Sequence, residues 1–336
     1  MNTTESTLLL SFVIPVYNVE RYLEECVESI LCQNTESFQI VLVDDGSTDT
    51  SREICDRYAA RYSNIQVIHK ANGGLSSARN AGIAAADGKY VTVVDSDDKI
   101  CSGSVAELLH WIQTENADLC FLHADRLFPN NELMDLNEEI VRSELHGKSK
   151  EAAIRHLATR PKYPGCAWAK LYRRSFLNDH DLHFPYDTRY SEDLGFVRDC
   201  ILCADSFDVL DVPFYLYRQS RQGSITNKKS AKSFYDLLLF VTESVDKLTV
   251  NKKPINEISR FAMSFAAYEY AALLHLYHKI PKADKKQALE KMAAYRWVLR
   301  FANNKRIKAV SLLCSLFGMR FTAFLAVKYR KAKMRI

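Results

Sequence analysis

Residues 38–49 read FQIVLVDDGSTD, an apolar run that ends in two adjacent carboxylates, a glycine and side chains that favour the start of a helix. A short apolar run bounded by turn residues is typical of a buried β-strand. Gly46 suits a tight turn, and Ser47 or Asp49 can cap the helix that follows. A strand that leads directly into a helix predicts an α/β fold.

The same rhythm continues on both sides of this stretch. Strand-like apolar runs cover residues 9–16, 65–69 and 90–94, and helix-like segments cover residues 20–32, 50–62 and 76–86. Continuous apolar strands between helices indicate a parallel sheet with helices on both faces. Ligands of such sheets bind at the carboxyl ends of the strands, so we expect the chemistry in the loops after Val16, Val43 and Val94.

Carboxylates end two of these strands. Residues 93–98 read VVDSDD, so Asp95 and Asp97 form a D-x-D pattern of oxygen ligands that suit Mg2+ or Mn2+. Asp44 and Asp45 end the other strand, where a carboxylate can accept a hydrogen bond from a nucleotide base or a ribose hydroxyl. Each pattern alone also fits an ordinary strand–turn–helix connection. Two acid pairs at one edge of a sheet favour a metal-dependent nucleotide site.

A glycine loop lies between the two acid motifs. Residues 70–80 read KANGGLSSARN, in which the glycines let the backbone approach a ligand and Arg79 can reach a nucleotide. The G-x-G-x-x-G fingerprint of dinucleotide-binding Rossmann folds is missing after the first strand, where Pro15-Val16-Tyr17-Asn18 stands instead.

Together these motifs resemble glycosyltransferase family 2, whose GT-A fold is a mixed, mainly parallel sheet with helices on both faces. The resemblance rests on residues 12–18 (FVIPVYN), 43–47 (VDDGS), 72–80 and 95–98, and covers about residues 8–226. It implies that Asp97 coordinates Mn2+ or Mg2+ and that a nucleotide-sugar, expected to be a UDP-sugar, is the donor. The donor-binding residues implied are Pro15, Tyr17, Asp44, Asp45, Arg79, Asp95, Ser96, Lys170 and Arg218.

A later pair of acids resembles the family's Glu-Asp motif. Residues 190–196 read YSEDLGF, and the resemblance implies that Asp193 and Glu192 are catalytic residues. Asp193 is the expected general base, which deprotonates the acceptor hydroxyl in an inverting displacement. The alternative is a helix start whose acids interact favourably with the helix dipole. Trp168 is either an apolar platform for an acceptor sugar or a core residue.

The chain divides by its pattern into a GT-A catalytic domain at residues 1–228 and a helical extension at residues 229–336. We expect residues 8–100 to be the nucleotide-sugar-binding half and residues 101–228 the acceptor half. Nine scattered cysteines indicate a reducing compartment, and neither a signal peptide nor a membrane span is expected. A net charge of +4 with both signs interspersed argues against nucleic acid as a partner.

Residues 301–336 carry no Asp or Glu, and their nine basic side chains are interleaved with apolar ones. This composition suits a helix that lies on an anionic membrane surface, or a helix packed on the catalytic domain with a solvated basic end. We therefore expect a cytoplasmic enzyme, peripheral at the inner face of the membrane, that acts on a glycan or a polyprenyl-diphosphate-linked acceptor in cell-surface polysaccharide synthesis. A nucleotidyltransferase or an inactive sugar-nucleotide-binding assembly partner is the alternative.

Overall fold

The computed structural model describes residues 8–33, 35, 37–136, 140–160, 162–186, 188, 190–220 and 229–333. It divides into two compact units. The α/β unit comprises Met1–Lys150, Cys166–Asp187 and Asp199–Gln222, and the helical unit comprises Glu151–Gly165, Thr188–Arg198 and Gly223–Ile336. Two segments before residue 228 therefore group with the C-terminal helices rather than with the sheet.

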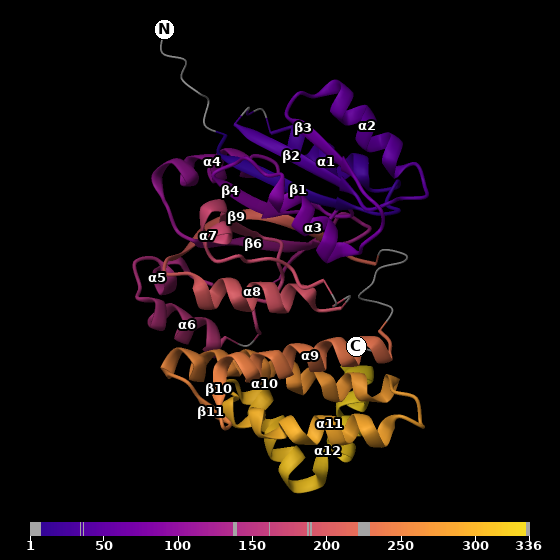
Figure 1. The fold of residues 1–336 in the computed structure, drawn as a ribbon, viewed down its shortest axis with the longest axis vertical. Coiled ribbons are helices and arrows are strands. Elements are labelled where there is room, and N and C mark those ends of the chain that lie inside the picture. Colours follow the sequence, from indigo (N-terminus) through magenta and orange to yellow (C-terminus); the bar gives the residue numbers. More distant parts are fainter. Residues whose placement is uncertain are drawn as a thin grey trace. The chain divides into compact units, whose positions relative to one another are not determined.

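One mixed sheet forms the centre of the α/β unit (Figure 1). Its strands lie in the order β3-β2-β1-β4-β8-β6-β9-β5, with β7 paired to β6. The first four in this order are parallel, and β8 joins them antiparallel to β4. The predicted α/β fold with a mixed sheet is thus confirmed. The strands are β1 (Leu10–Val16), β2 (Phe38–Asp44), β3 (Ile65–His69), β4 (Tyr90–Val93), β5 (Lys99–Ile100), β6 (Leu119–Leu127), β7 (Leu133–Asp135), β8 (Lys170–Arg173) and β9 (Phe207–Arg218).

Helices cover both faces of this sheet. Alternate side chains of a strand point to opposite faces, and every residue of β1 is buried, so both faces are covered. Phe12 and Ile14 of β1 belong to the core formed with α1 (Leu23–Leu31), α2 (Ser51–Arg61) and α4 (Ser104–Thr114). Val13 points the other way, toward α3 (Leu75–Ala84). Gly82 permits that close approach, since a Cβ there would lie 2.4 Å from Val13 Cγ1. Short helices α5 (Arg142–Leu145) and α7 (Arg174–Asp179) complete the unit.

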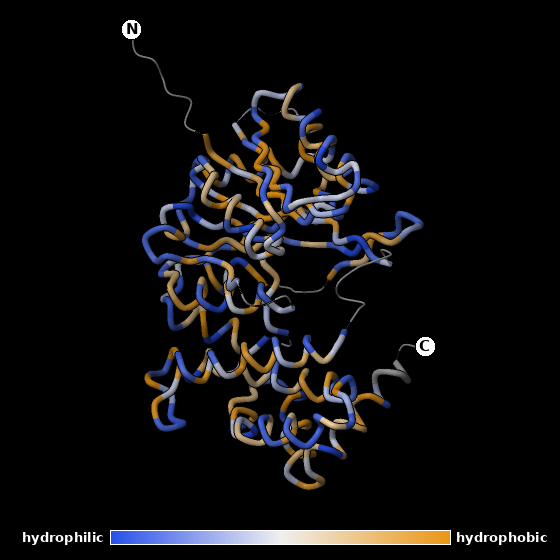
Figure 2. Tube along the Cα trace, turned by 45° about the vertical axis from the view of Figure 1, so that its right-hand side comes forward, coloured by the Kyte–Doolittle hydropathy of each residue, from blue (hydrophilic) through white to orange (hydrophobic). Residues whose placement is uncertain are grey.

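The helical unit is held by apolar stacking and by one buried arginine. The Tyr163 ring stacks on the Phe265 ring at 4.5 Å between centroids, and its hydroxyl donates to the Leu194 carbonyl at 2.9 Å. Buried Arg198 donates to Ser244 Oγ at 2.9 Å. Figure 2 shows hydrophobic and hydrophilic residues alternating along these helices, as expected of helices buried on one side. The elements are α6 (Lys150–Thr159), the start of α8 (Glu192–Cys203), α9 (Ala231–Leu248), β10 (Thr249–Val250), β11 (Lys253–Pro254), α10 (Glu257–Leu276), η2 (Tyr277–Lys279), α11 (Lys285–Tyr295), η3 (Arg296–Phe301) and α12 (Lys305–Lys333).

Helix α12 combines apolar length with a sharp kink. Among the described residues, Lys305–Tyr329 is the one helical stretch long and apolar enough to cross a membrane by length and composition, with a mean hydropathy of 1.8. Gly318 interrupts it with φ 74° and ψ 166°, which no α-helix allows. The last helix is therefore two arms joined at a glycine.

Candidate active site

The carboxyl ends of β2, β1 and β4 lie side by side, because the parallel register pairs Val16 with Asp44 and Val13 with Val93. Asn18 ties the loops after β1 and β2 together. Its Oδ1 accepts the Thr48 N–H at 2.8 Å, and its own N–H donates to Ser47 Oγ at 3.2 Å. The structure thus forms the edge at which the sequence predicts a ligand. Pro15 is buried within β1, whereas the Tyr17 side chain at this edge is 48% exposed.

The two acids after β2 make different contacts. Asp44 is buried and accepts the Ser47 N–H at 2.9 Å, and its other oxygen lies 2.9 Å from His69 Nδ1. Burial acts to lower the pKa of His69, but its hydrogen bonds with Asp44 and Asp56 outweigh that effect and raise this pKa. The contacts of Asp44 favour a structural role in the β2–α2 turn.

Asp45 closes the glycine loop. One carboxylate oxygen accepts Lys70 Nζ at 2.6 Å and the Gly73 N–H at 2.9 Å, and the other accepts the Gly74 N–H at 2.7 Å. Two carboxylate oxygens offer about four acceptor positions, so one remains for a donor from a ligand. Asp45 can therefore meet a base N–H while it holds the loop.

Arg79 joins the glycine loop to the D-x-D motif. The arginine is 1% exposed, and its Nη2 donates to Asp95 Oδ1 at 2.8 Å. Its guanidinium lies over the Phe184 ring at 5.1 Å. A buried guanidinium fixed on both sides positions Asp95 rather than reaching freely into solvent.

Asp98 fixes the acid loop to β9. It is buried, and it accepts the Tyr215 hydroxyl at 2.7 Å and the Arg218 N–H at 2.8 Å. The same hydroxyl accepts the Asp95 N–H at 3.1 Å. Burial, followed by the negative charges of Asp97 and Asp95, raises the pKa of Asp98 to about 8. Three carboxyl groups crowded within four residues fit a hard divalent cation, which would relieve their repulsion.

Ser96 and Arg218 flank this acid loop. Ser96 is buried, whereas Asp95 and Asp97 are partly exposed. Arg218 Nε donates to the Asp97 carbonyl at 2.7 Å, and Arg218 Nη2 donates to Glu25 at 2.5 Å. Arg218 therefore lies beside the main chain of the motif, at the end of β9.

Trp168 and Lys170 lie on or before β8. Trp168 stacks against Tyr215 at 4.6 Å and against Tyr217 at 5.3 Å between ring centroids. Lys170 is 2% exposed, and its Nζ donates to the Cys166 carbonyl at 2.5 Å. An ammonium held in this way favours a structural role over contact with a diphosphate.

The Glu-Asp motif begins α8 in the helical unit. Ser191, with φ 70°, accepts the Leu194 N–H at 3.1 Å just before the helix. Glu192 is buried and Asp193 is half-buried. Gly165 lies against this turn, where a Cβ would be 2.4 Å from Leu194 Cδ2. The turn that carries Asp193 is thus closely packed within its own unit.

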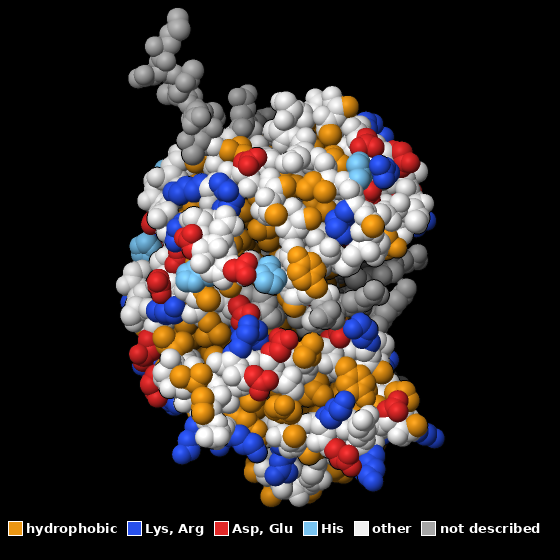
Figure 3. Space-filling model, in the orientation of Figure 1, with side chains coloured by type: hydrophobic (Ala, Val, Ile, Leu, Met, Phe, Trp, Pro, Cys, Tyr) orange, Lys and Arg blue, Asp and Glu red, His pale blue; other side chains and the backbone are white. Residues whose placement is uncertain are grey.

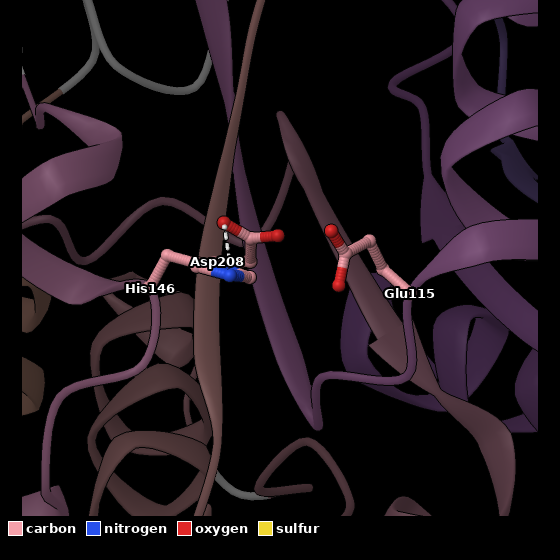
Figure 4. Close-up of side chains that lie close together, drawn as sticks. All are labelled: Glu115, His146 and Asp208. Atoms are coloured by element: carbon pink, nitrogen blue, oxygen red, sulfur yellow. Dashed lines mark ion pairs between the residues drawn. The ribbon is translucent and has the colours of Figure 1, made fainter.

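A separate group of potential metal ligands lies at the other end of β9. Among the described residues, ligand atoms of Glu115, His146 and Asp208 lie within 4.8 Å of one another (Figure 4). Arg142 already joins the two carboxylates, with Nε 2.8 Å from Asp208 and Nη2 2.5 Å from Glu115. Asp208 and Arg218 are ten residues apart on one strand, which places them about 30 Å apart. This group is an ion-pair cluster remote from the D-x-D motif.

Sequence reasoning missed the roles of Lys70, Asp98 and Tyr215. Asp98 stands in the quoted acid motif, and Lys70 begins the quoted glycine loop. Tyr215 is separated from Asp98 by 117 residues, so the contact depends on the pairing of β5 with β9. Residues 223–226 (GSIT), which resemble the family's loop that closes over the donor, lie outside the described residues.

Comparisons with known proteins agree with this geometry. Residues 11–181 match the family model "Glycosyl transferase family 2". The chain is 36% identical over 217 residues to the uncharacterized glycosyltransferase EpsJ of Bacillus subtilis, covering 63% of this chain and 61% of EpsJ. It thus spans less than two thirds of that relative.

Two solved structures share the fold. One is residues 1–349 of TarS from Staphylococcus aureus in complex with UDP-GlcNAc, with a TM-score of 0.68, 19% identity, and coverage of 96% of this chain and 92% of that one. TarS is a poly(ribitol-phosphate) β-N-acetylglucosaminyltransferase. The other is the mannosyltransferase PcManGT of Pyrobaculum calidifontis with GDP-Man and Mn2+, with a TM-score of 0.55, 14% identity, and coverage of 96% and 87%. The chain therefore belongs to glycosyl transferase family 2 and has the GT-A fold.

Proposed function

We propose that this protein transfers a sugar from a UDP-sugar to a glycan or lipid-linked acceptor in cell-surface polysaccharide synthesis. One observation carries the proposal: the ends of three parallel strands gather Tyr17, Asp45, Asp95 and Asp97 at one edge of the sheet. The relative TarS, whose structure holds UDP-GlcNAc, supports a nucleotide-sugar donor. Within this site Asp45 would accept the N–H of the base, Tyr17 and Pro15 would line the base pocket, and Asp95, fixed by Arg79, would meet the ribose.

Asp97 is the residue proposed to hold Mn2+ or Mg2+. Its carboxylate stands beside Asp95 and Asp98 in a set of hard oxygen ligands. The structure of PcManGT was solved with GDP-Man and Mn2+, which supports a divalent cation as the partner of such a site. A bound ion would supply positive charge that stabilises the diphosphate leaving group.

Asp193 is the proposed general base. It takes the proton from the acceptor hydroxyl while that oxygen forms a bond to the anomeric carbon. The bond from that carbon to the diphosphate oxygen breaks on the opposite side, and its electron pair leaves with the nucleoside diphosphate. Attack opposite the leaving group inverts the anomeric configuration. Glu192, the neighbouring buried acid, would help to fix the helix start that carries Asp193.

Location follows from the C-terminal composition. We propose that residues 301–336 bring the enzyme to the cytoplasmic face of the membrane, where a polyprenyl-diphosphate-linked acceptor would be found. Nine basic residues and no acid in this segment support the contact.

Thermal unfolding with UDP, GDP and CMP, each with and without Mn2+, tests the donor site, because a ligand of the folded state raises its apparent stability. We expect UDP with Mn2+ to raise the unfolding temperature, and Asp97→Ala to abolish that rise. Asp211→Ala is the matched control, since this acid of β9 is 84% exposed and pairs with His123 of β6, away from the acid motif. No response to any of the three nucleotides would refute the proposal.

A second variant separates an enzyme from an inactive binding partner. Asp193→Asn should stop transfer from a UDP-sugar and leave the UDP-dependent stabilisation unchanged. Transfer of the nucleotidyl group of a nucleoside triphosphate to an acceptor, with release of pyrophosphate, would instead favour a nucleotidyltransferase.

A further inference from the structure

The kink in α12 limits how this helix can meet a bilayer. Gly318 separates the arm Lys305–Phe317 from the arm Met319–Lys333. At 1.5 Å per residue the arms are about 20 Å and 22 Å long, shorter than the roughly 30 Å of a bilayer's hydrocarbon core. Neither arm can cross a membrane by itself.

The kink is held in place by the helical unit. Thr322, 1% exposed, donates through Oγ1 to the Gly318 carbonyl at 2.8 Å. The Tyr270 hydroxyl of α10 lies 3.1 Å from Met319 Sδ, one residue after the glycine. Cys314 and Ala323, on either side of the glycine in sequence, are also buried. One side of the kink is therefore fixed to the protein.

Large apolar side chains stand on the other side of the kink. Their exposed fractions range from 45% to 65%, and we call them the apolar wedge: Leu312, Leu316, Phe317, Phe321 and Phe324. Ring centroids of Phe317 and Phe321 are 5.4 Å apart, and those of Phe321 and Phe324 are 6.5 Å apart. The three rings thus form one patch rather than scattered single residues, and such patches mark contact sites.

Most of the positive charge lies at the ends of the two arms, and the exception is Arg320, which is exposed two residues after the glycine. Lys305, Arg306 and Lys308 are exposed at the first end, and Lys328 is exposed near the other. Arg330, Lys331, Lys333 and Arg335 follow in the sequence. Figure 3 shows basic side chains among apolar ones over the C-terminal helices. A patch of aromatic residues between two groups of cations complements the acyl layer and phosphates of an anionic lipid surface.

We propose that α12 docks on an anionic bilayer as a kinked hairpin, with the apolar wedge inserted among the acyl chains and both arm ends at the phosphates. This inference rests on the membrane contact proposed above and states how the helix makes that contact. The kink makes the contact one-sided, so both ends of α12 remain on the same side of the bilayer.

The test uses the full chain and vesicles of phosphatidylcholine, with or without one third phosphatidylglycerol. The triple variant Phe317→Ser, Phe321→Ser, Phe324→Ser should bind the anionic vesicles at least about tenfold more weakly than the unmodified protein. The control is Val250→Ser with Ile255→Ser, which removes side chains 63% and 57% exposed elsewhere in the helical unit and should bind as before. Lys305→Gln, Arg306→Gln and Lys308→Gln together should weaken binding to the anionic vesicles and reduce its dependence on salt.

Three results would refute the insertion of the apolar wedge into a bilayer. Unchanged vesicle binding by the triple variant would exclude insertion of these rings. Conversion of a dimer to a monomer by that variant, with vesicle binding unchanged, would assign the patch to a second copy of the chain. A C-terminal tag that is accessible only from the side opposite the α/β unit, judged by protease treatment of sealed membrane vesicles, would show a span.

The membrane proposal and the donor proposal can be refuted independently. The triple variant should keep the UDP-dependent stabilisation, because the donor residues belong to the α/β unit. Loss of UDP binding in the unmodified protein would refute the proposed donor and leave the vesicle result to decide the wedge.

Discussion

At the scale of single residues, the Tyr215 hydroxyl joins two parts of the acid motif. We expect Tyr215→Phe to leave Asp98 and the Asp95 N–H short of a partner, which costs about 1–3 kcal/mol in the free energy of unfolding. The loosened loop should also weaken Mn2+-dependent UDP binding, measured by titration calorimetry. Tyr90→Phe, which removes a buried hydroxyl bonded to the Ala117 carbonyl, should lower stability alone. Equal UDP affinities in both variants would contradict this role.

Asp208 provides a pH-dependent contribution to stability. Burial acts to raise its pKa, but hydrogen bonds from Arg142, Trp111 and the Val209 N–H outweigh burial and hold the pKa below its ordinary value of 3.8. The stabilisation is therefore fully present above about pH 4 and is lost as the pH falls through the lowered pKa.

Asp208→Asn should accordingly lower the free energy of unfolding by about 1–3 kcal/mol at pH 7, because it weakens the charge-assisted hydrogen bonds that the buried carboxylate accepts from Arg142 and Trp111. Urea unfolding between pH 7 and pH 3 should show the difference from the unmodified protein shrinking in acid. Asp205→Asn, on an acid 83% exposed and paired with Lys150, should change stability by less than about 1 kcal/mol. A pH-independent loss for Asp208→Asn would contradict the linkage.

Glu269 has the opposite dependence on pH. Burial raises its pKa to about 8, against a smaller lowering by the charge of Lys229. Its folded pKa exceeds the ordinary 4.5, so its contribution is most favourable below about pH 4.5 and is lost as the pH rises toward 8.

Glu269→Gln should therefore stabilise the protein by a few kcal/mol at pH 8 and by little at pH 4.5. Chemical unfolding at the two pH values measures the change. Glu257→Gln, on an acid 60% exposed beside Arg260, serves as the control and should have little effect at either pH. A stabilisation that is equal at both pH values would show that burial of the charge is not its cause.

At the scale of helices and strands, the packing of α3 on β1 depends on Gly82. A methyl group there would lie 2.4 Å from Val13 Cγ1 and 3.1 Å from Val43 Cγ2. Gly82→Ala should destabilise the fold by about 1–3 kcal/mol through overpacking, despite the better helix propensity of alanine. Ala84→Ser adds an atom to an exposed position of the same helix and should be nearly neutral in urea unfolding. A stabilised Gly82→Ala variant would contradict the tight contact.

The sequence predicts the helices and strands of the α/β unit well, because hydrophobic periodicity and turn-forming residues are local signals. The run at residues 38–43 became β2, and the acids at 44–45 and 95–98 follow β2 and β4 as expected. Lys170 shows where local pattern fails. The resemblance implies that it binds the donor, but its ammonium donates to the Cys166 carbonyl. Such contacts depend on how the chain returns to the sheet rather than on local pattern.

At the scale of the whole molecule, the sequence predicts a boundary at residue 228, whereas the segments Glu151–Gly165 and Thr188–Arg198 group with the C-terminal helices. The reason is physical: Tyr163 stacks on Phe240 and Phe265, and buried Arg198 donates to Ser244. The local composition of those two segments does not indicate these contacts, because the partners are tens of residues away in the sequence.

Removal of residues 229–336 should therefore disturb more than membrane contact. The shortened chain would expose Tyr163 and leave Arg198 without Ser244, so we expect it to aggregate during size-exclusion chromatography and to bind a hydrophobic dye. The full chain with the three wedge substitutions is the control, and it should remain monodisperse. A shortened protein that stays monomeric and loses only vesicle binding would contradict this dependence.

The interleaving of the two units also bears on how such enzymes can diversify. Three separate stretches of the chain form the helical unit: Glu151–Gly165, Thr188–Arg198 and Gly223–Ile336. The turn that carries Asp193 keeps its supporting helices only if all three are inherited from one parent. A single crossover near residue 228 would combine one parent's Asp193 turn with another parent's supporting helices. Recombination among relatives should therefore exchange whole genes more readily than C-terminal halves.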